Sequence, residues 1–133
     1  MFSGLCLIVD DEPAIRRFLR SILQGRRLEI IEAEDAVSAL RLVKQLNGRV
    51  DLIVSDIRMP GDMNGVDLAY SVRNAYPAIP IILISGFSEE QCSGALDFCC
   101  VAKPFLPETL LQEVERALIP NQQGAVSNTA NVD

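Results

Sequence analysis

Short apolar runs alternate along the chain with longer segments in which apolar residues recur at helical spacing. The first run, 5–9, is apolar throughout, which is typical of a strand buried on both faces of a sheet. After it, Pro13 marks a helix start, and Gln24-Gly25 marks the end of that helix. Between them one apolar stripe repeats every three or four residues, and the arginines lie outside it; they are Arg16, Arg17 and Arg20.

The same alternation continues to the end of the chain. It predicts further strands at 28–33, 50–55, 80–84 and 98–102 and further helices at 35–46, 66–75 and 107–119, with a short helical piece at 89–96. Within the helix at 35–46, we expect Val37, Leu40 and Val43 to face the core. Strands that alternate with helices in this way predict an α/β fold with a doubly wound, five-stranded parallel sheet.

The length and composition indicate one folded domain followed by a tail. The chain has 133 residues, of which 49% are hydrophobic and 23% charged, as in ordinary globular domains. We expect the domain to span 1–119, and we expect 120–133 to be a polar, disordered tail with little to bury. The net charge of −6, from 12 basic and 18 acidic residues, argues against direct binding of nucleic acid, because phosphate backbones need a basic surface.

The chain contains no histidine, and this excludes several kinds of site. A Ser-His-Asp triad, a histidine-ligated zinc and a histidine phosphodonor all require the missing side chain.

The four cysteines do not form a C-x-x-C pair, and no apolar stretch approaches membrane-spanning length. The N-terminus lacks the basic region of a signal peptide. We therefore expect a cytoplasmic domain without membrane insertion.

Polar residues follow four of the five predicted strands. They are Asp10-Asp11, Asp56, Ser85 and Lys103. In a parallel sheet these ends share one edge, where open α/β sheets bind their ligands. Three carboxylates there would repel one another without a cation, and Mg²⁺ accepts such oxygen ligands. A lysine and a hydroxyl nearby would suit a phosphoryl group, and one carboxylate could act as its nucleophile.

Each of these features taken singly has a commoner structural explanation. An acidic pair after a strand is usually a helix N-terminus, a serine at a strand end is usually a turn residue, and a lone lysine is usually solvated. Asp56 by itself would more often cap a loop than act as a nucleophile. The four features in this order are far more specific, and together they indicate phosphoryl chemistry.

The motifs LCLIVDDEP, VDLIVSDIRMPG, IPIILISGFS and VAKPF carry a resemblance that spans roughly 4–119. Here the chain resembles the receiver domains of two-component response regulators, which take part in phosphorelays. The resemblance implies a flavodoxin-like fold with strand order 2-1-3-4-5. The segment PGDMNG and the pair Ser85-Gly86 are most similar to receivers attached to hybrid histidine kinases.

The resemblance also implies roles for the acidic residues. Asp56 would be the phosphoacceptor. It would take its phosphoryl group from a phosphohistidine on a sensor histidine kinase or a histidine phosphotransfer protein. Asp11 would bind Mg²⁺ directly, Asp10 would act mainly through water, and the backbone carbonyl of Arg58 would be a further ligand. The phosphorylated domain would then control a downstream protein partner.

By the same resemblance, Ser85 would supply the switch hydroxyl and Lys103 would bind the phosphoryl group. The Lys103–Pro104 peptide bond is expected to be cis. The only catalysis implied is Mg²⁺-dependent self-phosphorylation and autodephosphorylation.

Two departures from the family pattern keep other interpretations open. Cys100 stands three positions before the lysine, where the family usually has Tyr, Phe or another large residue. Phe98 could share its face of the strand. Only 86–102 separates Ser85 from Lys103, so we expect a shortened fourth helix. These departures favour, as an alternative, a receiver-like module that binds proteins without phosphorylation.

A phosphohydrolase of the haloacid dehalogenase type is a further alternative, since it also combines Mg²⁺, a nucleophilic aspartate and a lysine. Those enzymes carry D-x-D after the first strand, whereas this chain has DDE there and no cap domain. The pattern therefore favours the receiver.

Overall fold

The computed structural model describes residues 4–86 and 98–118. Its strands are β1 (Gly4–Val9), β2 (Leu28–Ala33), β3 (Leu52–Asp56), β4 (Ile81–Ser85) and β5 (Cys99–Ala102). Its helices are α1 (Pro13–Leu23), α2 (Ala36–Gln45), α3 (Gly65–Ala75) and α5 (Pro107–Leu118), with a 3₁₀ turn, η1 (Gln24–Arg26), after α1. No helix in these ranges is long and apolar enough to cross a lipid bilayer.

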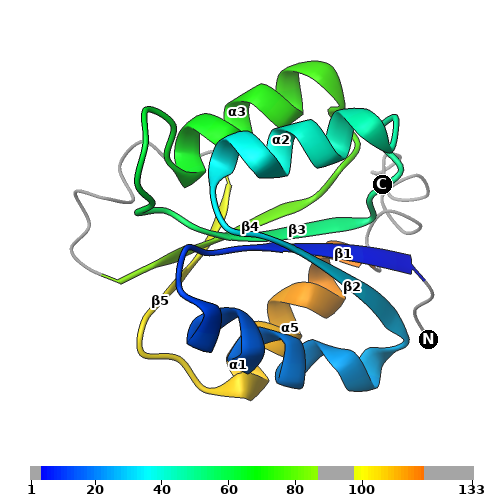
Figure 1. Cartoon of the computed structure of the whole chain (residues 1–133). Helices are drawn as coiled ribbons and strands as arrows, with labels where there is room; N and C mark the ends of the chain where they lie inside the picture. The colour runs from blue at the N-terminus through cyan, green and yellow to red at the C-terminus, as the bar shows by residue number, and fades with distance from the viewer. Residues whose placement is uncertain (1–3, 87–97, 119–133) are drawn as a thin grey trace, which may run out of the picture.

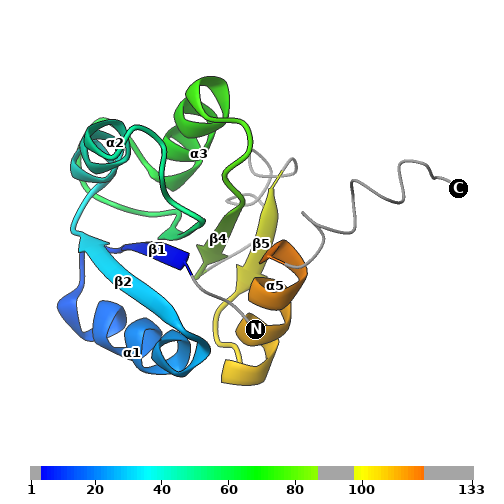
Figure 2. The same cartoon turned by 90° about the vertical axis from the view of Figure 1, so that its right-hand side faces the viewer.

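The five strands form one parallel sheet in the order β2-β1-β3-β4-β5. Helices α2 and α3 cover one face of it, and α1 and α5 cover the other (Figures 1 and 2). The predicted doubly wound sheet and its strand order are therefore confirmed. The expected short helix at 89–96 and the expected tail at 120–133 lie outside the described residues.

The core consists of two apolar layers, one on each face of the sheet. Every residue of β3 is buried, as expected for a central strand with helices on both sides. Alternate side chains enter opposite layers: Ile53 packs beneath α2 and α3, whereas Val54 packs beneath α1 and α5. The central strands are therefore held from both sides, and their carboxyl ends are fixed in place.

Helix α2 corrects one prediction from the pattern. Val37 is 51% exposed, and the buried residues of the helix are Ala36, Ala39 and Val43. The helix carries two apolar stripes at similar spacing, and the one with alanines packs inward because small side chains fit between the helix and the sheet. The pattern alone cannot distinguish two such stripes. Leu40 lies between them and is partly buried.

Two side-chain caps fix the loops that enter α2 and α3. The Oδ1 atom of Asp35 accepts a hydrogen bond of 2.8 Å from the Ser38 N–H at the start of α2. Before α3, Asn64 and Asp67 form a capping box, in which each side chain accepts a bond from the other residue's N–H at 2.9 Å. These caps define where the loops after β2 and β3 end.

Candidate functional site

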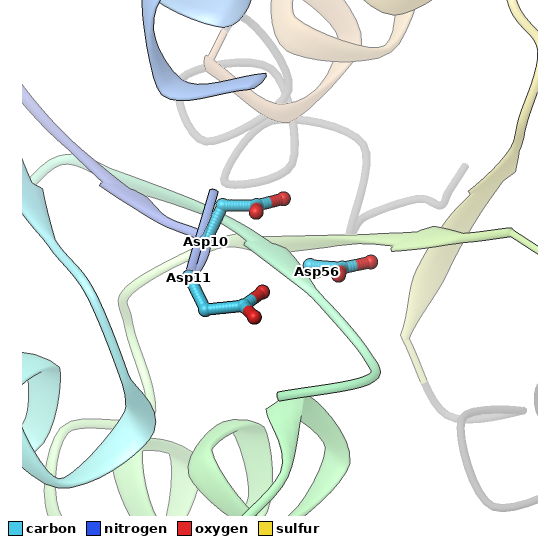
Figure 3. Close-up of side chains that lie close together, drawn as sticks. All are labelled: Asp10, Asp11 and Asp56. Atoms are coloured by element: carbon cyan, nitrogen blue, oxygen red, sulfur yellow. The ribbon is translucent and has the colours of Figure 1, made fainter. Parts of the chain in front are cut away.

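The acidic residues that follow β1 and β3 meet at the carboxyl edge of the sheet. Because Val9 pairs with Ser55, the next residues, Asp10 and Asp56, lie side by side on neighbouring strands. Carboxylate oxygens of Asp10, Asp11 and Asp56 all lie within 4.8 Å of one another. Figure 3 shows the three side chains pointing into the same space beyond the strand ends.

Two of these carboxyl groups are buried. Asp10 is 2% exposed and Asp56 is 9% exposed, whereas Asp11 is exposed. Burial raises the pKa of Asp10 to about 6, against the opposing hydrogen bond from the Glu12 N–H to its Oδ1 at 2.8 Å. Burial also raises the pKa of Asp56, and the nearby Lys103 opposes that rise. Three crowded carboxylates form a donor set that suits a hard divalent cation, so the cluster could hold a metal ion.

The edge strand β5 brings Lys103, the residue that follows it, to the same place. Its Nζ lies 3.5 Å from Oδ1 of Asp56, and its backbone N–H donates a 2.7 Å hydrogen bond to the carbonyl of Ser85. Ser85 is fully buried at the end of β4. The predicted cis bond between Lys103 and Pro104 is present. The structure thus brings together the three aspartates and the lysine, and its main chain joins Ser85 to that lysine.

The loop after β3 is held on both sides. The Ile57 N–H donates to the carbonyl of Ile84 at 3.0 Å, and the Ile57 carbonyl accepts from the Gly65 N–H at 2.8 Å. The next residue, Arg58, has an exposed side chain two positions beyond Asp56. The acceptor candidate Asp56 therefore sits at the start of a loop whose backbone is fixed to β4 and to the start of α3.

Gly65 belongs to the site, although the sequence pattern placed the start of the helix one residue later, at 66. A Cβ atom at position 65 would lie 2.1 Å from the carbonyl oxygen of Asp56 and 2.9 Å from Cα of Ile57. Both neighbours are backbone atoms that cannot rotate away. Helix α3 can therefore begin this close to the Asp56 backbone only with glycine at its first position.

Replacing Gly65 by alanine is expected to destabilise the domain by about 2 kcal/mol, because the backbone carrying Asp56 must move to admit the methyl group. The urea midpoint measures this loss. Gly25→Ala is the matched control, since a Cβ there meets nothing within 4 Å. Equal midpoints for the two variants would contradict the close approach at Gly65.

Comparison with known proteins decides the family of the chain. Residues 6–115 match the sequence model of the response regulator receiver domain. The chain belongs to this family. This receiver is 35% identical over 120 residues to the sensor kinase CckA of Brucella abortus, covering 87% of this chain and 13% of that protein. It is 33% identical over 122 residues to the DNA-binding response regulator MtrA of Mycolicibacterium smegmatis, covering 87% and 51%.

Solved structures agree with this assignment. A CheY-like response regulator receiver domain protein from Methanospirillum hungatei superimposes with a TM-score of 0.83 at 27% identity, covering 92% of this chain and 99% of that one. The receiver spans about half or less of the curated relatives named above. It is a receiver domain of two-component signalling systems, homologous to response regulators and to the CckA receiver.

The position that usually holds a large residue in this family is occupied by Cys100, and Phe98, the residue before β5, packs in the same apolar layer of the receiver. Both residues pack against the apolar layer beneath α3, as strand alternation predicts. The Phe98 ring meets Tyr70 edge-on, with centroids 5.0 Å apart, and Arg73 lies 4.0 Å from its centroid. Phe98 is therefore held against α3, and the position three residues before Lys103 is occupied by the small side chain of Cys100.

Proposed function

We propose that this receiver accepts a phosphoryl group on Asp56 and then changes conformation to control a partner protein. The observation that carries the proposal is the grouping around Asp56: two further carboxylates lie within 4.8 Å and the Lys103 ammonium lies 3.5 Å away. The donor is a phosphohistidine on a sensor histidine kinase or a histidine phosphotransfer protein, in keeping with the receiver family.

In this proposal the cofactor is Mg²⁺. Asp11 and Asp56 bind it directly, Asp10 acts mainly through water, and the backbone carbonyl of Arg58 completes the protein ligands. The three crowded carboxylates, two of which are buried, support this assignment, because a hard cation relieves their repulsion. When bound, the ion neutralises charge on the phosphoryl oxygens.

Asp56 is the nucleophile. One of its carboxylate oxygens forms the new P–O bond while the P–N bond of the donor phosphohistidine breaks, and the histidine nitrogen takes up a proton. The Lys103 ammonium compensates phosphoryl charge, and the Ser85 hydroxyl donates a hydrogen bond to a phosphoryl oxygen. Self-phosphorylation from a small phosphodonor and hydrolysis of the acyl phosphate are the only catalysis that we assign.

The proposal also concerns the wider protein. The receiver domain occupies 1–119, 120–133 form a polar tail, and the domain acts in the cytoplasm. The output is a protein contact rather than direct nucleic-acid binding, which the net charge of −6 disfavours. Similarity to the receiver of a sensor kinase supports a place in a phosphorelay.

Amide NMR spectra with a phosphoryl analogue test this function. We expect Mg²⁺ with beryllium fluoride, which mimics a phosphoryl group on a carboxylate, to shift amides around Asp56, Ser85 and Lys103. Asp56→Asn should bind no analogue and show only the Mg²⁺ response. A wild-type spectrum that the analogue leaves unchanged would contradict the proposal and favour the phosphorylation-independent docking module.

A further inference from the structure

The turn between β1 and α1 carries two of the three clustered aspartates, yet its own hydrogen bonds are few. Glu12, the residue before α1, makes no side-chain cap. Within the turn, the Glu12 N–H donates to Oδ1 of Asp10, and the Asp10 N–H donates to the carbonyl of Ala33 at 3.2 Å. The carbonyl of the buried Asp10 needs a donor from outside the turn.

Arg16 supplies that donor from the first turns of α1. Its Nη1 donates to the Asp10 carbonyl, and its Nε donates to Oε1 of Glu32 at 2.9 Å. The side chain is 16% exposed, so both bonds are largely shielded from water. One planar guanidinium thus joins the end of β1 to the neighbouring strand β2. Lysine does not reproduce this geometry, because its donors all lie on one nitrogen at the end of a flexible chain.

Glu32 holds the guanidinium in place. Its second oxygen, Oε2, accepts a 2.8 Å bond from Nε of Arg20, one turn further along α1. Hydrogen bonds from Arg20 and Arg16 lower the pKa of Glu32, so its charge is retained at neutral pH. Since Arg16 contacts Glu32 and the backbone carbonyl of Asp10, we take this arginine to act by holding the turn rather than as a counter-ion for the aspartates.

We propose that Arg16 is a positioning residue that orients Asp10 and Asp11 for Mg²⁺. This inference rests on the proposed function. Groups that orient metal ligands commonly change metal affinity by 10- to 100-fold when they are removed. Arg20 provides the matched comparison, because it contacts the same Glu32 carboxylate but, within the part of the chain that the structure describes, makes no hydrogen bond to the turn.

The test is a Mg²⁺ titration followed by amide NMR for the wild type, Arg16→Met and Arg20→Met. We expect Arg16→Met to raise the Mg²⁺ dissociation constant about tenfold and Arg20→Met to stay within twofold of the wild type. Urea midpoints in metal-free buffer should fall in both variants, and further in Arg16→Met, which loses the bond to the Asp10 carbonyl as well as a bond to Glu32. A purely structural role would change the midpoints without separating the two affinities.

Arg16→Lys keeps the positive charge and serves as the test variant if Arg16→Met does not fold. We expect it also to bind Mg²⁺ several-fold more weakly, because the single, flexible ammonium lacks the rigid planar fork with which arginine reaches both acceptors. Affinities for Arg16→Met and Arg16→Lys that match Arg20→Met, with normal binding by the wild type, would overturn the positioning role alone. A wild type that binds no Mg²⁺ would instead overturn the proposed function.

Discussion

Replacing Asp10 by asparagine is expected to stabilise the metal-free domain at pH 7.5. The carboxylate is buried beside two others, and asparagine keeps the oxygen that accepts the hydrogen bond from Glu12 while removing the charge. The rise in the pKa of Asp10 from 3.8 to about 6 sets an upper limit of roughly 3 kcal/mol on the gain. Urea unfolding in the presence of a chelator measures it.

The gain should depend on pH in a defined direction. The pKa of Asp10 is higher in the folded state, so its contribution to the free energy of unfolding is fully present below about pH 4 and is lost as the pH rises through about 6. The difference between Asp10→Asn and the wild type should therefore shrink by about half at pH 5. A variant that is less stable than the wild type at pH 7.5 would contradict the electrostatic account.

Magnesium should narrow the difference in stability between the two proteins. Binding to the folded state alone stabilises the wild type in proportion to the logarithm of the ion concentration. Asp10→Asn retains fewer charged oxygens in the cluster, so its urea midpoint should respond less to the same Mg²⁺ concentration. Equal responses would remove Asp10 from the metal site.

Asp56→Asn is expected to abolish phosphoryl transfer and leave the fold unchanged. The amide has the volume of the carboxyl group but lacks the nucleophilic oxygen, so incorporation from acetyl phosphate with Mg²⁺ should fall at least about 100-fold. Intact-mass spectrometry over time gives the rate. Asp62→Asn, the same substitution at an exposed position in the loop after β3, is the control and should keep the wild-type rate.

Much of the fold could be predicted because its signals are local. A buried central strand must be apolar throughout, and β3 is such a strand. The meeting of Asp10 with Asp56 could also be predicted, because parallel strands end at one edge and these residues follow their strands directly. The contact between Lys103 and Asp56 has the same origin, since β5 runs parallel to β4 and ends at the same carboxyl edge of the sheet.

Other features depend on how the elements approach one another, and the sequence pattern does not contain that information. The clash of a Cβ at Gly65 with the Asp56 backbone arises only once α3 has packed beside the end of β3. Arg16 lies outside the apolar stripe of α1. It reaches Glu32 and the Asp10 carbonyl only because of the orientation in which that helix packs on the sheet. Val37 was wrongly predicted to face inward because two stripes share one spacing.

The most direct test of the central claim is to locate the phosphoryl group on the chain. After reaction with acetyl phosphate and Mg²⁺, borohydride reduction converts an aspartyl phosphate to homoserine. Trypsin then releases the peptide 50–58, which contains Asp51 as well as Asp56, so fragmentation must separate the two. We predict homoserine at position 56 only. The assignment of Asp56 as the acceptor would be contradicted by homoserine at position 51, by homoserine in another peptide, or by its absence from all peptides.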